Sequence, residues 1–425
     1  MAFLGMKGTG QFATDERPKS WRQGILREYP NGVAPLTAIL SMLDSEPCDD
    51  YEFFWWTDTL PNENAAITGV YTDSGLADAF TTAARSKDAY LYVKMAADDV
   101  SKFRPGLTVH LVKKDDSTKE VYGKVTQVIP NGANSSVAVK LRADVAAGDG
   151  NGVDYIRIIG TSNAQGAARP ESQLRKPEKF TNFTQIFRDP LSMTRTALQT
   201  RLRTVESRKE ARRQALEYHA IRMEKAFINE IASETVGDNG QPETTTRGII
   251  PSIKAYAPDN IDSFKRNSDF TGTWIAEGKD WFNAKLEQVF RYGDTEKLGL
   301  CGSGALEGIN QLAEHYGTIQ LTARQVDYGL QVVEWVTAHG IAYLMSSPLF
   351  TQDVFRRNSI LFVEPRKLKF RYIQDTIFKT DIDYDNMTAS DLGKDAAEEE
   401  FLTEAGLEMH FPQHMALLED VGLNN

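Results

Sequence analysis

Between residues 88 and 160 the apolar positions follow the pattern of short strands. Turn signals such as Arg104-Pro105-Gly106 and Pro130-Asn131-Gly132 separate five runs of β-branched, leucine and tyrosine side chains. The expected strands are Tyr90–Val93, Leu107–Val112, Glu120–Val125, Val137–Leu141 and Tyr155–Ile159. Strands of this length and spacing predict a small antiparallel barrel or sandwich. Because extended chain is expected on both flanks, this part is predicted to be an insertion into a larger fold.

A helical period follows over residues 201–233, and the two halves of this helix differ. The second half carries a stripe of apolar side chains that predicts a packed face, namely Leu216, Ala220, Met223, Phe227 and Ile231. His219 lies within it and is expected to make a packing hydrogen bond. At 1.5 Å per residue the whole helix would span about 50 Å.

The first half of the same helix has almost no apolar stripe. It carries a cluster of basic side chains, namely Arg208, Lys209, Arg212 and Arg213. This cluster is either a solvated helix face or a surface that meets an anionic partner. In both cases neutralising the four charges is expected to spare the folding of the subunit.

After residue 236, helical and strand patterns are mixed without a strict βαβ order, which indicates an α+β fold. Helices are expected to end near Gly293 and Gly317, because glycine suits the position after a helix. Four strands are expected at residues 331–336, 341–345, 360–363 and 368–373. The acidic segment Asp391–Glu400 is expected to be exposed.

The N-terminal part combines a polar segment with an aromatic run. Residues 1–34 are rich in glycine and charge, so they form either a disordered tail or an arm that orders against a neighbouring subunit. A short amphipathic helix is expected at residues 36–43. Four consecutive aromatic residues in a strand would be buried on both faces. These four are therefore expected in a core or a subunit interface rather than a ligand platform: Phe53, Phe54, Trp55 and Trp56.

A polar, proline-containing stretch at residues 167–179 precedes an apolar strand. An arm that reaches away from its own domain usually serves another subunit. We therefore expect the whole strand to lie at a subunit interface: Asn182, Phe183, Thr184, Gln185, Ile186, Phe187 and Arg188. In a strand of period two, Phe183 and Phe187 share one face and Ile186 lies on the other.

Composition narrows the class of protein. A chain of 425 residues can bury a large core and divide into two or three subdomains. The net charge of −11 disfavours a dedicated nucleic-acid-binding protein, without excluding local basic patches. Two cysteines, Cys48 and Cys301, indicate a reducing compartment. We expect no secretory signal and no membrane span.

Candidate catalytic and metal-binding patterns are weak. Leu300-Cys301-Gly302-Ser303-Gly304 lacks the glycine that a nucleophile elbow needs two residues before the serine. Gly302, Gly304 and Gly308 give only a loose dinucleotide-binding pattern. His410 and His414 are four residues apart, but Pro412 argues against a regular helix between them. We therefore expect no catalytic residues, no cofactor and no metal.

Three blocks of the sequence resemble a known family. Asn182–Arg188 resembles the N-[FY]-T-Q-I-F segment of major capsid proteins of tailed bacteriophages. Residues 35–56, from Pro35-Leu36-Thr37-Ala38 through Glu46-Pro47 to the aromatic run, resemble the N-terminal block of the same group. The strands of Phe103–Arg157 resemble its small β insertion. The group is that of the SU-ten-like capsid proteins, which share the Hong Kong-97 fold with encapsulins.

The resemblance implies a structural protein and a division of the chain. It implies an N-terminal arm and short helix (residues 1–56), an extended-loop region with the β-rich insertion (57–200), a spine helix (201–235), and an axial domain with the remaining peripheral strands (236–425). Pentamers and hexamers would form an icosahedral shell around double-stranded DNA, in a virion assembled in the bacterial cytoplasm. The basic cluster would then face packaged DNA or a neighbour's acidic loop.

The resemblance also implies partners and leaves alternatives. The chain itself would be the main partner, together with scaffold, portal and a decoration protein. Two other functions stay open: an encapsulin-like shell, or a cytosolic nucleotide-binding enzyme that uses Gly302–Gly308. Some shells of this fold join a loop lysine to a neighbour's asparagine. Lys176, Lys179 and Asn386 are candidates, but the lysines lie in a polar stretch that would keep them protonated. We expect non-covalent contacts only.

Overall fold

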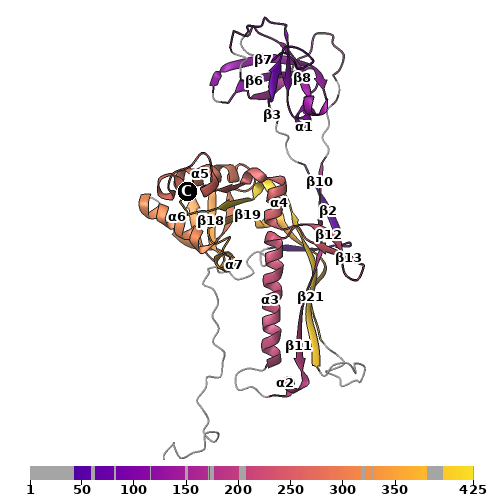
Figure 1. Ribbon diagram of the computed structural model, residues 1–425, viewed down its shortest axis with the longest axis vertical. Helices are drawn as coiled ribbons and strands as arrows, with labels where there is room; N and C mark the ends of the chain where they lie inside the picture. The colour runs from indigo at the N-terminus through magenta and orange to yellow at the C-terminus, as the bar shows by residue number, and fades with distance from the viewer. Residues whose placement is uncertain are drawn as a thin grey trace, which may run out of the picture. The chain divides into compact units, whose positions relative to one another are not determined.

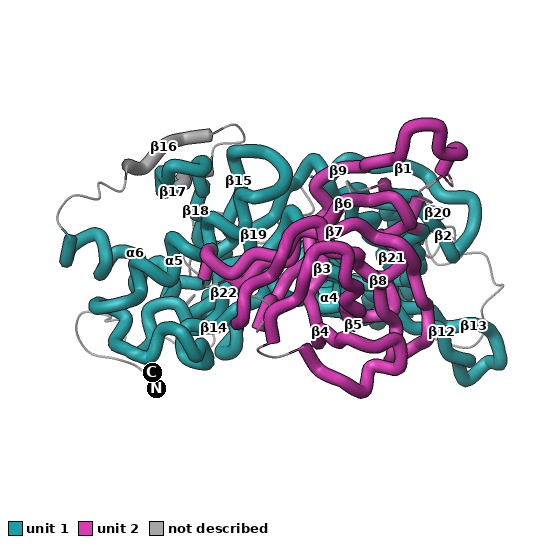
Figure 2. The backbone as a smooth tube through the Cα atoms, turned by 90° about the horizontal axis from the view of Figure 1, so that it is seen from above, with its two compact units in different colours: residues 1–57, 179–425 teal, residues 58–178 magenta. Residues whose placement is uncertain are grey.

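The computed structural model describes residues 43–58, 63–80, 83–114, 116–148, 152–170, 172, 177–200, 207–316, 322–326, 330–380 and 396–424. The chain divides into two compact units (Figure 2). Unit 1 comprises residues 1–57 and 179–425, and unit 2 comprises residues 58–178. The short helix expected at residues 36–43 falls outside the described residues except for Leu43.

Unit 2 is built on one seven-stranded antiparallel sheet. Its strands, in spatial order, are β3 (Asn64–Ala66), β9 (Tyr155–Thr161), β6 (Leu107–Lys113), β7 (Asp116–Ile129), β8 (Ser136–Leu141), β5 (Tyr90–Lys94) and β4 (Gly69–Tyr71). The short helix α1 (Ala97–Val100) follows β5. All five predicted strands are present. One side of the sheet is fully buried, with Val109, Leu111, Val139 and Ile156 at 0% exposure.

The first sheet of unit 1 is four-stranded and lies beside a long helix. Its order is β1 (Asp44–Pro47), β20 (Leu368–Lys379), β21 (Ala396–Met409) and β11 (Gln185–Thr194). The long helix α3 (Ser207–Asn229) lies along β11 and β21, with the short α2 (Arg195–Gln199) between β11 and α3 in sequence (Figure 1). Two strand pairs complete this part: β2 (Glu52–Thr57) with β10 (Glu178–Phe183), and β12 (Ser233–Val236) with β13 (Pro242–Thr245).

The second sheet of unit 1 has seven strands of mixed direction. Its order is β14 (Ile261–Ser263), β22 (Ala416–Glu419), β19 (Ile360–Val363), β15 (Glu296–Cys301), β18 (Ile341–Ser346), β17 (Leu330–Val336) and β16 (Thr322–Val326). Helices α5 (Trp274–Phe290) and α6 (Ser303–Tyr316) pack on it through a core that contains Trp281, Phe282 and Ile309. Helices α4 (Ile249–Tyr256) and α7 (Pro348–Gln352) join the neighbouring core with Phe227. The α+β prediction is confirmed.

Helix α3 is shorter than predicted. It ends at Asn229, and the chain is extended again from Ser233, so the expected end at residue 233 is wrong. The predicted burial of the apolar stripe is confirmed in its middle, where Met223 and Phe227 are buried. It is wrong at both ends, where Leu216 and Ile231 are 44% and 62% exposed. The backbone of Gly248 lies against the last carbonyls of the helix, and its N–H donates to Glu230 O at 2.8 Å.

The glycines of the loose dinucleotide pattern have a packing role. A Cβ on Gly302 would come within 2.3 Å of the carbonyl oxygen of Arg357. A Cβ on Gly308 would come within 2.4 Å of the Cα of Gly422. Both glycines therefore allow close approach of two backbones. In the described residues around this turn, the contacts of the glycines are explained by packing alone.

No helix in the described part of the chain is long and apolar enough to span a membrane.

We predict that Gly308→Ala destabilises unit 1 by about 1–3 kcal/mol, because the methyl group would overlap backbone that cannot rotate away. Thermal unfolding followed by circular dichroism measures this. Glu307→Ala, an exposed position on the same helix, is the matched control and should leave the melting temperature nearly unchanged. Equal melting of the two variants would contradict the packing role.

Candidate assembly interface

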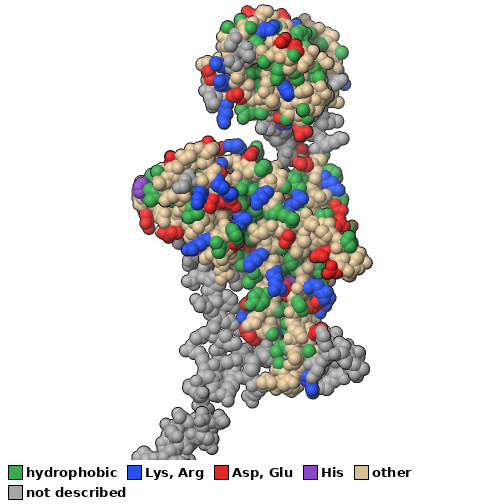
Figure 3. All heavy atoms as spheres, in the orientation of Figure 1, with side chains coloured by type: hydrophobic (Ala, Val, Ile, Leu, Met, Phe, Trp, Pro, Cys, Tyr) green, Lys and Arg blue, Asp and Glu red, His purple; other side chains and the backbone are tan. Residues whose placement is uncertain are grey.

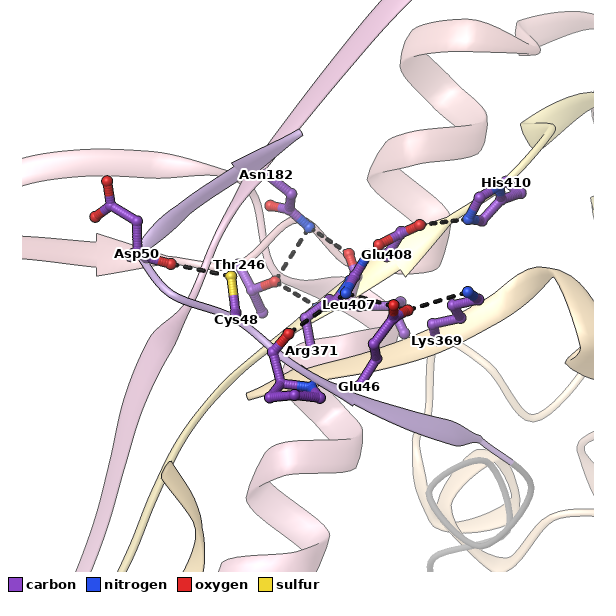
Figure 4. A network of polar contacts seen from close by, with 11 residues as sticks. Glu46, Cys48, Asp50, Asn182, Thr246, Lys369, Arg371, Leu407, Glu408 and His410 are labelled. Atoms are coloured by element: carbon purple, nitrogen blue, oxygen red, sulfur yellow. Dashed lines mark hydrogen bonds and ion pairs between the residues drawn. The ribbon is translucent and has the colours of Figure 1, made fainter. Parts of the chain in front are cut away.

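The strand that begins the described chain is fastened to the sheet by a chain of ion pairs (Figure 4). Strand β1 pairs in parallel with β20, and Glu46 accepts from Lys369 at 3.0 Å and forms an ion pair with Arg371 at 3.1 Å. Arg371 also binds Glu408 on β21, which in turn contacts His410. Burial alone would raise the pKa of Glu408, but the hydrogen bonds from His410 and Arg371 outweigh it and lower the pKa. Strand β1 is therefore held at the edge of this sheet by both strand pairing and ion pairs.

Asn182 is an internal clamp rather than an interface residue. It is 2% exposed, and its side-chain amide donates to Leu407 O at 2.7 Å, to Arg247 O at 3.1 Å and to Thr246 Oγ1 at 3.2 Å (Figure 4). Its carbonyl accepts from the backbone N–H of Arg247 at 2.7 Å. These bonds tie β10 to β21 and to the segment before α4. The prediction that Asn182 lies between subunits is wrong.

The expected alternation along residues 182–188 is broken at Thr184. Thr184 is 1% exposed and lies between β10 and β11, and the next buried side chain is Phe187, so the strand changes phase directly after Thr184. Phe187 is buried in the core beside Phe227, whereas Phe183 is half-buried and stacks on Tyr51. The predicted shared face of Phe183 and Phe187 is therefore wrong, and Thr184 and Phe187 are core residues. Ile186 is 56% exposed. Gln185 is partly exposed, and its side-chain carbonyl accepts from Thr246 N at 3.2 Å.

The aromatic run on β2 is buried on one face only. Phe53 is 7% exposed, and Trp55 stacks on Phe180 of β10 at 6.0 Å between ring centroids. Phe54 and Trp56 point the other way and are 55% and 58% exposed. These two side chains are thus not in the core of the subunit, whereas their predicted place in a subunit interface stays a prediction. The reason is that β2 belongs to a two-stranded ladder, so the chain covers only one of its sides.

The basic half of α3 is paired with a buried glutamate. Glu399 on β21 is 3% exposed, and its carboxylate accepts from Arg208 at 2.5 Å and from Arg212. Arg213 binds Glu210 and Glu217 on its own helix. Lys209 is exposed, with contacts of its own. Of the two alternatives for the cluster, a merely solvated face is wrong for Arg208 and Arg212. The expected exposure of Glu399 is also wrong, and neutralising these arginines would leave a buried carboxylate without its partners, against the expectation that folding is spared. Residues 391–395 lie outside the described part.

A second buried carboxylate fastens the middle of the helix. Asp189 on β11 is 4% exposed, and its Oδ2 lies 2.8 Å from Nδ1 of His219. The other ring nitrogen of His219 lies 2.7 Å from Thr403 Oγ1 on β21. Arg222, one turn further along, also pairs with Asp189. Burial lowers the pKa of His219. The predicted packing hydrogen bond of His219 is confirmed.

The two candidate metal-binding histidines face different partners. His410 contacts Glu408, whereas His414 Nδ1 lies 3.1 Å from Glu364. Among the described residues, no group of three histidine, cysteine or acidic side chains is placed to hold a metal ion. Cys301 is buried, and burial raises the pKa of its thiol. Lys176 and Asn386 lie outside the described residues, and the ammonium of Lys179 lies 4.2 Å from the ring centroid of Phe54.

Comparison with known proteins shows the family to which the chain belongs. The profile of the family described as SU10 major capsid protein matches residues 10–422. The chain belongs to this family. The major capsid protein of Pseudomonas phage PaMx41 is 26% identical over 360 residues, which cover 84% of this chain and 78% of the relative. The resemblance to the SU-ten-like major capsid proteins, stated from the sequence, is thereby confirmed.

Solved structures give distant similarities. A chain from Mycobacterium phage Bobi aligns over 96% of both chains with a TM-score of 0.46 and 7% identity. A chain from Microbacterium phage Oxtober96 aligns over 95% of this chain and 96% of its own, with a TM-score of 0.43 and 9% identity. The holo-SrpI encapsulin complex of Synechococcus elongatus aligns over 58% of this chain and 77% of its own, with a TM-score of 0.40 and 12% identity.

Reasoning from the sequence missed the two buried carboxylates of this capsid protein. Glu399 lies in an acidic run, and its arginine partner Arg208 is 191 residues earlier in the chain. One signal was available: the i, i+4 spacing of Arg208 and Arg212 places both on one helix face. That spacing indicates a shared partner but does not identify it.

We predict that Glu399→Gln destabilises the subunit by on the order of 2 kcal/mol at neutral pH. This is less than the 3–5 kcal/mol typical of a fully buried pair, because the two arginines are 22% and 33% exposed. Burial would raise the pKa of Glu399, but hydrogen bonds from Arg212 and Arg208 lower it below the ordinary 4.5. The stabilisation is therefore complete above about pH 4.5 and is lost as the pH falls through the folded-state pKa.

Urea unfolding at neutral and acidic pH measures this effect. The difference between wild type and variant should shrink as the pH is lowered below 4.5. Glu398→Gln, on the exposed face of the same strand, is the control and should change little. A destabilisation that is the same at every pH would argue against an ionised Glu399.

Proposed function

We propose that copies of this chain assemble as pentamers and hexamers into an icosahedral shell around double-stranded DNA. Membership of the capsid family supports this proposal most strongly. A second support is that unit 1 folds with large apolar side chains still in water, including Phe54, Trp56 and Ile186. The family match favours this function over the encapsulin-like shell and over an enzyme. We further propose that the protein has no catalytic activity.

The proposed contacts between subunits now rest on fewer residues than the sequence indicated. The proposal retains Phe54 and Trp56 on β2 and Ile186 and Arg188 on β11, all of which are exposed. The side chain of Arg188 is 61% exposed and lies 2.5 Å from Glu400. Acidic and basic side chains are interspersed on the face of the molecule shown in Figure 3. Such mixed charge suits contacts between identical subunits, where each charge can meet its opposite.

We also propose that the basic side chains of α3 lie on the inner surface of the shell, although their own acidic partners reduce the charge that they offer to DNA. Arg208, Lys209, Arg212 and Arg213 contribute four positive charges, and Glu399, Glu210 and Glu217 bring three negative charges to the same surface. The net charge offered to DNA is therefore small, and only non-specific proximity to the packaged DNA is proposed. Scaffold, portal and decoration proteins are proposed as further partners, and the bacterial cytoplasm as the place of assembly.

Expression of the chain, alone or with its scaffold, tests the proposed function. We predict sedimenting capsomers, shells or tubes that are visible by negative-stain electron microscopy. Because the proposed contacts are non-covalent, boiling the particles in detergent should give one band near 47.5 kDa. A stable monomer under all salt conditions would contradict the shell proposal. A ladder of multimers that resists boiling and reducing agent would contradict non-covalent assembly.

Substitutions on the two faces of β2 test its proposed contact. We predict that Phe54→Ser combined with Trp56→Ser leaves the melting temperature of the subunit unchanged but strongly reduces particle yield. Phe53→Ala, on the buried face of the same strand, should instead destabilise the subunit by about 3–5 kcal/mol. Normal assembly of the double variant, measured by sedimentation, would remove Phe54 and Trp56 from the proposed interface.

A further inference from the structure

The turn after α7 presents two adjacent apolar side chains to water. Val354 and Phe355 are each 89% exposed, the highest values among the large apolar side chains that the structure describes. Isolated apolar residues on a surface are common. Two neighbours of this size with almost no protein contact are a different case, because burying them would be strongly favourable.

The backbone of this turn is held firmly in place. The N–H groups of Arg356 and Arg357 donate to Asp353 O at 3.1 and 2.9 Å, and the Asp353 carboxylate accepts from Phe355 N at 2.9 Å. Arg356 lies 2.7 Å from Glu419 on β22. Behind the turn, the carbonyl of Arg357 packs against Gly302, where no side chain would fit. The exposed pair therefore projects from a fixed base and not from a loose loop.

A groove of about 890 Å³ lies beside this turn, within unit 1. Strand β11 contributes the exposed Ile186 on one side, and Leu349, Phe350 and Phe355 contribute apolar surface on the other. The lining is mixed in charge, with Arg188, Arg222, Lys225 and Arg356 together with Glu230, Asp353 and the buried Asp189. Pockets for small ligands are mostly apolar with few polar groups. An apolar floor with a charged rim is instead the anatomy of a protein–protein contact.

We propose that this groove, with Val354 and Phe355 as one wall, is a contact surface for a second copy of this chain. The inference rests on the proposed shell function, since every subunit of a shell has copies of itself as neighbours. Ile186 and Arg188, already proposed as contact residues on β11, form the opposite wall, so the two surfaces are continuous. A segment of the neighbouring copy fills the groove and covers Val354 and Phe355.

The contact expected here is heterologous. A neighbour related by a five-fold or six-fold rotation presents a different patch from the one that it covers, which is how rings of subunits close. The mixed lining supports this arrangement, because basic and acidic groups along one groove fix the direction and register of the segment that binds. Within the proposed shell, this groove is therefore a specific surface that the neighbouring subunit covers.

The combined variant Val354→Ser with Phe355→Ser tests the inference. It leaves the Asp353 turn and the Arg356–Glu419 ion pair in place, so the subunit should melt at the wild-type temperature. We predict at least a tenfold lower yield of particles. Val336→Ser combined with Tyr292→Ser is the matched control: both side chains are exposed apolar residues of unit 1 that do not line the groove. Its yield should stay near that of wild type.

A second measurement covers the case in which the serine variant fails to fold. Phe355→Cys is introduced alone, and labelling of the new thiol is followed by mass spectrometry in free subunits and in particles made from the purified chain. The thiol should react at least tenfold more slowly in the particle. Equal labelling, with particles present, would overturn the groove contact and leave the shell function intact. Protection only when another protein co-purifies would overturn the second copy as the occupant. Absence of wild-type particles would contradict the shell function itself.

Discussion

The pairing of two buried carboxylates with the long helix is the interaction on which the rest of unit 1 depends. Asp189 and Glu399 lie on neighbouring strands, and each would carry a large desolvation cost without partners. Helix α3 supplies the partners in two places, through Arg208 and Arg212 at its start and through His219 and Arg222 further along. Sliding the helix by one residue would break both sets together. The ion pairs therefore fix the register of α3 on β11 and β21.

Polar and apolar groups have different roles in this arrangement. Hydrogen bonds and ion pairs hold the extended strands in position within the subunit. These polar locks are formed by Asn182, by Glu399 and by the Glu46–Arg371–Glu408 chain. Apolar side chains on the same strands stay in water, because a two-stranded ladder or a strand edge covers only one face. A subunit built in this way can fold alone and still offer surfaces that another copy can bury. In the proposed shell, these surfaces are the ones that neighbouring copies cover.

The sequence predicted best what depends on local pattern. The strands of unit 2 were found because runs of β-branched and other apolar residues lie between clear turn signals, as at residues 107–112 and 137–141. The sequence also predicted helix α3, but not its end, where the backbone of Gly248 from a later part of the chain lies against the last carbonyls. Prediction failed at Thr184 because a one-residue phase change reverses every later side chain and leaves no mark in composition.

The candidate contact residues illustrate the same limit. Phe187 and Ile186 have equally apolar side chains, and only the position of α3 decides that the first is core and the second is surface. Likewise Glu399 is buried and Glu398 exposed within one acidic run, because the arginines that donate to the buried carboxylate come from a helix far away in the sequence. The family resemblance supplied the function before the structure did. It could not assign individual side chains to the inside of a subunit or to the space between subunits.

Hydrogen–deuterium exchange on free subunits and on assembled particles tests the central claim most directly. The claim is that polar locks are complete within one subunit, whereas the exposed apolar faces are covered only by neighbouring copies. Peptides from β2, from residues 185–188 and from residues 352–357 should become more protected in the particle, and the middle of α3 should exchange equally slowly in both states. Assembled particles in which these three segments exchange as fast as in the free subunit would contradict it.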